Sequence, residues 1–197
     1  MSTQVLTAPL YAEPLVGFRS RKAAQLCVWF ALQNNDKSIE KLKLIKLVYL
    51  SEREHLATYE ESMLLDELYS LPHGPICSST LNGINGVIHE EIWDDYVVRN
   101  GNIVMAVKNF DRGSLDDLSE EDLDLAKCVW SRFGHMTASQ IRNYTHLNCP
   151  EYTELDHGRL PISYRDVLNA VGSSHALELE QEMASLRQVE NILRQIS

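Results

Sequence analysis

The stretch KLKLIKLVYLSEREHL, residues 41 to 56, decides the fold because it is apolar around most of a helical circumference. The residues that interrupt it form one narrow polar stripe: Lys43, Lys46, Arg53 and Glu54. A helix that is apolar nearly all round is buried by its neighbours. The pattern therefore predicts a central, largely buried helix. It is expected to begin near Ser38, a residue suited to capping, and to end near Tyr59.

Another helix is predicted before it, over residues 20–34, where apolar side chains recur at helical spacing. Six positions carry that pattern: Ala23, Ala24, Cys27, Val28, Phe30 and Ala31. The preceding residues 1–18 contain two prolines and show no periodicity, so we expect a loose N-terminal arm. After the central helix, residues 77–91 indicate a weaker helix, since Gly83 and Gly86 disfavour it.

One segment changes to a strand pattern. Residues 96–99 and 102–107 are rich in β-branched and apolar side chains, and Asn100-Gly101 joins them. That dipeptide favours the positive φ angles that a two-residue hairpin turn requires. We therefore predict a β-hairpin here, and it is the only strong strand signal in the chain.

The second half of the chain contains clear helix starts. Three pairs have capping-box spacing: Ser119 with Asp122, Thr137 with Gln140, and Ser163 with Asp166. The first of these helices should end at Gly134, and the third at Gly172. A last helix over about residues 174–196 carries an apolar stripe formed by Leu179, Met183, Leu186, Val189, Leu193 and Ile196. The stripe either packs across the domain or contacts a partner chain.

These elements together predict a mainly α protein. We expect a single compact helical domain with one β-hairpin at about residues 95–107 and a C-terminal amphipathic helix. The expected organisation is a loose arm over residues 1–18, a domain over 19–173 and a terminal helix over 174–197.

Composition limits the functional classes. The chain has 197 residues and a formal net charge of −10, which argues against direct nucleic-acid binding because phosphates are bound by clustered Lys and Arg. No apolar run is long enough for a membrane span, and no signal peptide is recognisable. The four cysteines form no CxxC pair, and Cys27 and Cys128 lie in apolar helical patterns that suggest burial. We expect a cytoplasmic protein.

The corner Pro72-His73-Gly74-Pro75 allows two interpretations. In one, His73 activates Cys77 or Ser78 as the nucleophile of a small hydrolase. However, Pro75 separates the candidates, and no known nucleophile signature surrounds them. In the favoured interpretation Pro72, Gly74 and Pro75 form a rigid structural corner, because proline fixes φ and glycine accepts angles that other residues resist.

Cofactor and metal sites find little support in the sequence. The closest ligand spacings are His73-x3-Cys77 and His146-x2-Cys149, and neither has a second pair at zinc-site spacing. No phosphate-binding glycine motif is present. We therefore expect no metal, no cofactor and no catalytic residue, which favours a binding protein over an enzyme.

Four blocks of sequence resemble the Panacea-domain family, also called SocA-like. They are KLKLIKLVYLSEREHL (41–56), LPHGPICSST (71–80), LSEEDLDLAKCVWSRFGHMTASQIRNYTH (118–146) and PISYRDVLNAVG (161–172). Their order is also similar, and it places a Panacea-like domain at residues 19–173. Tyr152 departs from the family pattern, where tryptophan is expected, and Leu81 stands where an aromatic residue is common.

The resemblance implies an antitoxin of a toxin–antitoxin pair that directly binds a cognate protein toxin and neutralises it without catalysis. At least one relative delivers its toxin to a ClpXP-type protease, so a proteolytic adaptor is the alternative function. We expect the partner-binding surface around the corner and the following helix, at Tyr69, His73, Ser78, Ser79 and Asn82. The edge of the hairpin and the C-terminal helix are further candidate interfaces, and the helix could also form a homodimer.

Overall fold

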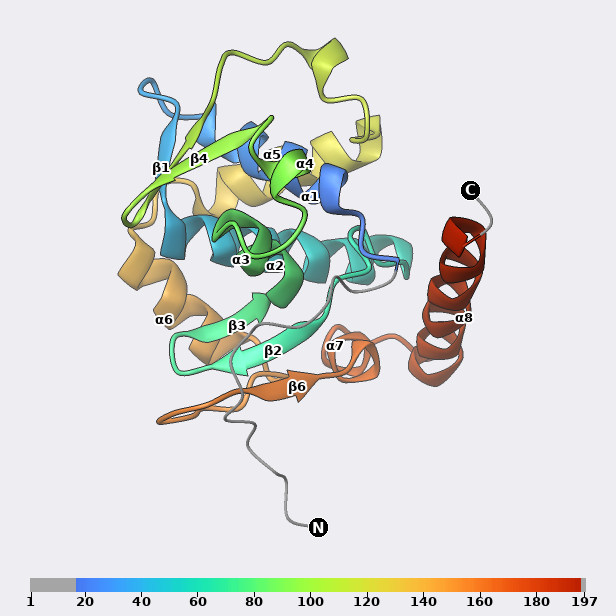
Figure 1. Cartoon of the computed structure of the whole chain (residues 1–197). Coiled ribbons are helices and arrows are strands. Elements are labelled where there is room, and N and C mark those ends of the chain that lie inside the picture. The colour runs from blue at the N-terminus through green and yellow to red at the C-terminus, as the bar shows by residue number, and fades with distance from the viewer. Residues whose placement is uncertain (1–16, 196–197) are drawn as a thin grey trace.

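The computed structural model describes residues 17–195, so the expected N-terminal arm lies, up to residue 16, outside the described residues. In the described part the chain forms eight α-helices and two three-stranded antiparallel sheets (Figure 1). The prediction of a mainly α fold with one hairpin is therefore wrong, because the protein is mixed α/β. One hairpin was expected, but the structure adds a second hairpin and a third strand to each sheet.

The helix α2 (Lys41–Tyr59) passes through the middle of the molecule, as predicted (Figure 1). It contacts α1 (Ser20–Ala31), α5 (Glu120–Phe133) and α6 (Ala138–Asn148). The six apolar positions predicted for the first helix are all fully buried in α1. These contacts on several sides explain why α2 is apolar around most of its circumference.

The expected N-cap of α2 at Ser38 is wrong. Residues 38–40 form the strand β1 (Ser38–Glu40), and the Ser38 hydroxyl donates to the Asp36 side chain at 2.7 Å instead of capping a helix. β1 pairs with β5 (Ile103–Ala106), which also pairs with β4 (Val97–Asn100), giving the order β1-β5-β4. The predicted hairpin is thus present, with its two-residue turn one position later, at Gly101 and Asn102.

The second sheet has the order β3-β2-β6, from β2 (Leu68–Leu71), β3 (Gly74–Cys77) and β6 (Leu160–Ile162). Both outer strands contain a proline, Pro75 in β3 and Pro161 in β6. Proline is tolerated at a sheet edge, where its missing N–H is not needed, but it weakens the strand pattern in a sequence. That is why this sheet was not predicted.

The helix expected over residues 77–91 is also corrected. Cys77 ends β3, and two shorter helices follow, α3 (Ser78–Ile84) and α4 (Glu90–Trp93). Gly83 lies against the Trp93 indole so closely that a Cβ at this position would overlap the ring. The glycine that lowered the helix signal is therefore required by close packing.

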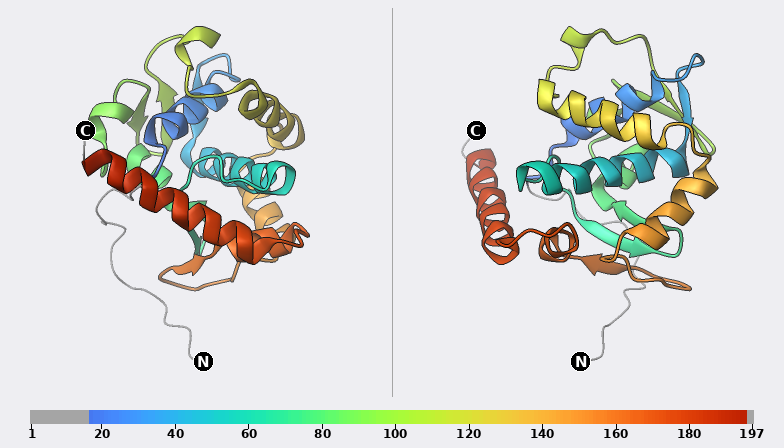
Figure 2. Two further views of the ribbon diagram at one scale, coloured as in Figure 1. Left: turned by 90° about the vertical axis from the view of Figure 1, so that its right-hand side faces the viewer. Right: turned by 180° about the vertical axis from the view of Figure 1, so that it is seen from behind.

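The predicted capping boxes are confirmed in α5, in α6 and in α7 (Tyr164–Ala170). A single 3-10 turn (Arg112–Ser114) precedes α5. The last helix, α8 (Ala176–Gln195), lies along one side of the molecule, where α7 is its main neighbour (Figure 2). Between residues 17 and 195 no helix combines the length and apolar character that a membrane span requires.

Of the two cysteines predicted to be buried, one is buried and the other is exposed. Cys27 is fully buried in the core as expected, whereas Cys128 is exposed on α5, so its predicted burial is wrong. α5 turns Leu125, Ala126 and Val129 toward the core, and Cys128 lies beside this face.

The apolar core also encloses charged side chains, among them Lys46, Glu52 and Asp66, each fully buried.

Candidate partner-binding site

The corner is the turn of the β2–β3 hairpin. Leu71 pairs with Gly74, which leaves Pro72 and His73 as a two-residue turn. Gly74 has a φ of +95°, a conformation that L side chains rarely adopt. Tyr152, from the segment after α6, donates its hydroxyl to the Leu71 carbonyl at 3.0 Å and braces the hairpin from outside the sheet.

Side chains from α2 and α6 meet directly beneath this turn. A Cβ atom at Gly74 would lie 3.0 Å from both Lys46 Nζ and Thr145 Oγ1, and 3.1 Å from His146 Cδ2. Lys46 donates to the Pro75 carbonyl at 2.7 Å. Glycine is thus required here for two reasons, its backbone conformation and the close approach of three side chains. We call Lys46, Gly74, Thr145 and His146 the hairpin cluster.

The hairpin cluster and the neighbouring Arg142 bring three basic side chains together beneath the turn, where burial and this crowding disfavour the charged forms of Lys46 and His146. Burial is the main cause that lowers the pKa of Lys46 to about 7, and the nearby Arg142 acts in the same direction. Burial, followed by the charges of Arg142 and Lys46, also lowers the pKa of His146. Arg142 itself reaches the Pro72 carbonyl with Nη2 at 3.5 Å. Lys46 and Arg142 therefore hold the hairpin from below by donating to the carbonyl oxygens of Pro75 and Pro72.

The predicted partner-binding residues do not share one exposed surface. His73 is exposed at the tip of the turn, and Tyr69 is half-buried with the Arg159 guanidinium 4.7 Å from the centre of its ring. Ser78, Ser79 and Asn82 retain exposed fractions of only 2%, 5% and 6%. The expectation that these last three residues are exposed is wrong, and a role in binding remains a prediction for all five.

The sequence model of the family described as Antitoxin SocA-like, Panacea domain, matches residues 44–151, more than half of the chain. The chain belongs to the Panacea-domain antitoxin family. No curated protein and no solved structure matches it significantly. The matched region contains the whole hairpin cluster, whereas α1, α7 and α8 lie outside it.

The family motifs thus meet in space in this Panacea domain. Lys46 comes from the central-helix block, Gly74 from the corner, and Thr145 and His146 from the end of the paired-helix block. They are separated by up to about a hundred positions in the chain, and the sequence alone does not show that they touch. Three of the four blocks thus contribute to one three-dimensional cluster, whereas the fourth, residues 161–172, contributes no residue to it.

The geometry of the hairpin argues against the hydrolase interpretation. His73 lies in the turn and Cys77 at the far end of β3, so the extended rise of roughly 3.3 Å per residue separates them by about 13 Å. A nucleophile and its base must be within hydrogen-bond reach. Cys77 is also buried, and burial raises the pKa of its thiol well above the ordinary value, opposite to what an activated cysteine needs.

Sequence reasoning missed the carboxylate that organises the start of α3. Asp66 Oδ1 accepts from the backbone N–H groups of Glu67 and Ser79, both at 2.7 Å. Its Oδ2 accepts from the N–H of Thr80 at 2.8 Å and from the Thr80 hydroxyl at 2.7 Å. An aspartate inside the apolar run before β2 was the available signal, because a buried acid must find donors.

A second buried acid, Glu52, was also overlooked. It lies on α2 outside the predicted polar stripe, and it contacts the Ser62 hydroxyl and accepts from the Leu64 N–H at 3.0 Å. Ser62 in turn lies 3.0 Å from the Tyr164 hydroxyl, which donates to the Asp66 carbonyl at 2.7 Å. Lys46 shows the converse error, since it was assigned to the polar stripe but is fully buried. Both acids serve to connect elements inside the domain.

Proposed function

We propose that this protein is an antitoxin that binds a cognate protein toxin directly, in a stoichiometric complex, and neutralises it without a catalytic step. Membership of the Panacea-domain antitoxin family is the observation that carries this proposal. The buried Cys77 and its distance from His73 support a binding role over the hydrolase alternative.

The β2–β3 hairpin tip is the surface that we propose for the toxin within the matched region. His73 projects at a turn whose backbone is fixed by Gly74, Lys46 and Tyr152. A side chain on a rigid support loses little conformational entropy on binding. Tyr69 and its neighbour Arg159 add an aromatic and a cationic group near the same hairpin, and both residue types are common at the centre of interfaces.

The test uses the product of the adjacent open reading frame as the toxin. The expected result is that this product stops growth, that the full chain restores it, and that the two co-purify. His73→Asp should weaken the complex about tenfold or more, measured by calorimetry. His135→Asp, at an exposed histidine after α5, is the matched control and should leave affinity unchanged.

Two outcomes would contradict the proposal. Growth restored without any complex would contradict neutralisation by stoichiometric binding. A shortened toxin half-life would then favour the alternative function, an adaptor that delivers its toxin to a ClpXP-type protease. If the toxin binds the His73→Asp variant and the native chain with equal affinity, the hairpin tip is not part of the interface.

A further inference from the structure

The terminal helix α8 has two faces with different roles. One row of residues turns toward the domain: Ala176 and Met183 are buried, Leu179 packs against the core, and Arg187 reaches the body of the protein. The predicted apolar stripe therefore divides, because Leu186 and Val189 point elsewhere. The Leu193 side chain and Ile196 lie outside the described residues.

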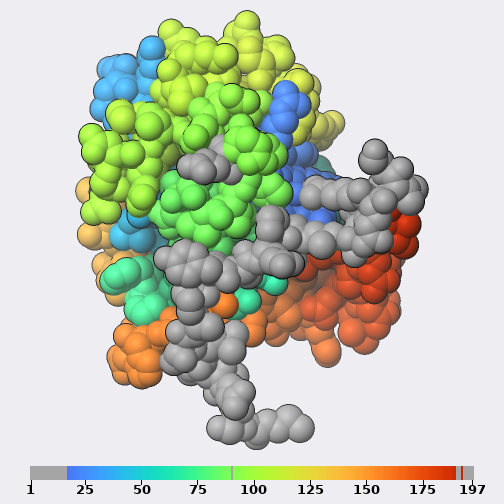
Figure 3. Space-filling model, in the orientation of Figure 1, coloured from blue at the N-terminus to red at the C-terminus, as the bar shows by residue number. Residues whose placement is uncertain are grey.

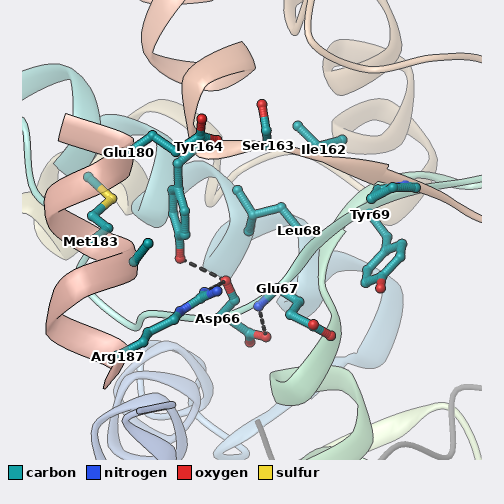
Figure 4. Close-up of a pocket in the computed structure, with 12 residues that line it drawn as sticks. Asp66, Glu67, Leu68, Tyr69, Ile162, Ser163, Tyr164, Glu180, Met183 and Arg187 are labelled. Carbon is teal, nitrogen blue, oxygen red and sulfur yellow. Dashed lines mark hydrogen bonds between the residues drawn. The ribbon is translucent and has the colours of Figure 1, made fainter. Parts of the chain in front are cut away.

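The inner face of α8 contacts the domain through apolar packing and hydrogen bonds. Figure 4 shows Met183 and Arg187 extending from α8 toward Tyr164 and Asp66, beside a pocket of about 290 Å³. Arg187 Nη2 donates to the carbonyls of Leu65 and Asp66 at 2.9 Å and 2.8 Å. Its guanidinium carbon lies 5.4 Å from the centre of the Tyr164 ring. These contacts fix the orientation of the helix on the domain.

The outer face of α8 carries large apolar side chains in contact with solvent. Leu186, Val189 and Ile192 retain exposed fractions of 51%, 52% and 59%. Their three-residue spacing makes them neighbours on the helix surface. Figure 3 shows α8, in red, forming an outer flank of the molecule. Large exposed apolar side chains that lie next to one another on a fixed helix are typical of an interaction surface.

Carboxylates adjoin this apolar patch along the helix. Glu178 and Glu182 precede Leu186 at four-residue spacing, and Gln181 and Ser185 precede Val189 in the same way. The two rows line one shallow hollow of about 570 Å³. The hollow is therefore acidic toward the start of the helix and apolar toward its end. We call it the α8 groove.

We propose that the α8 groove binds a basic amphipathic helix of the partner protein. Leucine-type side chains of that helix would pack on Leu186 and Val189, and its Lys or Arg side chains would meet Glu178 and Glu182. The proposal rests on the antitoxin function proposed above, and it assigns a chemical character to the partner. Because α8 lies outside the matched family region, the groove would provide recognition specific to this protein.

Charge favours a basic partner over a second copy of the chain. Each copy carries a net charge of −10. A parallel pair of α8 grooves would bring the glutamates of both copies together, and an antiparallel pair would set Glu178 and Glu182 of each copy against the apolar end of the other. Like charges at an interface suppress association, whereas complementary charges accelerate it. The acidic groove and the acidic chain thus point to the same kind of partner.

The test uses a designed 18-residue peptide that forms a helix with leucines on one face and lysines on the other. A matched peptide carries glutamate in place of every lysine. Fluorescence anisotropy with the purified full chain is expected to show binding of the lysine peptide and at least tenfold weaker binding of the glutamate peptide. Leu186→Gln together with Val189→Gln should weaken the lysine peptide about tenfold or more.

The control is Leu147→Gln, which removes an 84% exposed leucine from α6 and should leave peptide binding unchanged.

Equal binding of both peptides, or no effect of the α8 variant, would overturn the proposal. So would a dimer of the native chain that Leu186→Gln dissociates, because a second copy would then occupy the groove. The α8 variant should also lose complex formation with the toxin, and an unchanged toxin complex would overturn it. Failure of the native chain to bind the toxin would instead reject the antitoxin function.

Discussion

Lys46 shows how a single residue can oppose stability while it organises a site. Its ammonium group is buried and bonded to the Pro75 carbonyl. The folded pKa of about 7 lies below the ordinary value of 10.5. Below pH 7 the folded and unfolded states are both protonated, so the full cost of burying the charge is present. Between pH 7 and 10.5 the unfolded state binds more protons, so stability rises with pH.

We predict that Lys46 makes the free energy of unfolding rise between pH 6.5 and pH 8.5, as measured by urea denaturation of the native chain beside Lys46→Met. Lys46→Met should flatten this rise and stabilise the protein at pH 6.5 by about 1–4 kcal/mol, because it removes a buried charge without leaving a cavity. Burial raises the pKa of the Cys27 thiol in the folded state, so at higher pH the thiol ionises first in the unfolded state and lowers the stability. The comparison therefore ends at pH 8.5. Although burial opposes it, the hydrogen bond to Asp122 raises the pKa of His55, and this acts in the opposite direction over the same range in both chains. The decisive result is therefore the difference between the chains, and a Lys46→Met variant with the same pH dependence as the native chain would contradict the account.

Gly74 gives a second prediction at the residue scale. Gly74→Ala adds a Cβ at a φ of +95° and 3.0 Å from Lys46 Nζ, so it should lower the unfolding free energy by about 2 kcal/mol or more. Gly101→Ala is the matched control, since Gly101 also has positive φ but nothing lies within 4 Å of an added Cβ. Equal losses in the two variants would show that backbone strain alone matters and that the hairpin cluster does not restrict this position.

At the scale of elements, helices were predicted well and strands poorly, for identifiable reasons. A capping box is a local signal, and those at Ser119, Thr137 and Ser163 each began a helix as expected. The missed strands contain three or four residues, and two of them contain proline. Their pairing partners are up to 94 positions away, as for Leu68 and Ile162, and a single sequence does not reveal such pairs.

The candidate site was predicted only in part for the same reason. The corner was recognisable from Pro72, Gly74 and Pro75, because their backbone preferences are local. Ser78 and Ser79 are buried at the start of α3, where Asp66 accepts from the N–H groups of Ser79 and Thr80. Exposure is thus a property of the assembled elements, and local polarity alone gave the wrong answer.

Asp66 tests this account of α3. Asp66→Ala leaves buried N–H groups of Ser79 and Thr80 without their acceptor, so we expect a loss of at least about 2 kcal/mol in unfolding free energy. Asp124→Ala removes a 71% exposed carboxylate from α5 and should change stability by less than about 0.5 kcal/mol. If the two variants unfold at the same urea concentration, Asp66 does not organise the helix.

Arg187 tests the attachment of α8. Arg187→Ala removes its hydrogen bonds to the Leu65 and Asp66 carbonyls, so amide hydrogen exchange in α8 should accelerate about tenfold or more while exchange in α2 is unchanged. Arg132→Ala, at a half-exposed arginine on α5, provides the control. Unchanged exchange in α8 would mean that its apolar contacts alone hold it on the domain.

At the scale of the whole molecule, the structure combines a shared part and an individual part. The hairpin cluster, the paired helices and all of the central helix after residue 43 lie inside the matched Panacea region. The terminal helix lies outside it and presents an apolar and acidic groove on a flank of the molecule. We expect the shared part to fix the fold and the hairpin tip, and α8 to contribute recognition of one partner.

The most direct measurement of the central claim is co-purification of the full chain with the product of the adjacent open reading frame, combined with growth of the co-expressing cells. The account predicts that the product alone is toxic, that the chain relieves this toxicity, and that the two elute together in a fixed molar ratio. Relief of toxicity without a complex, or a complex that leaves the cells unprotected, would contradict it.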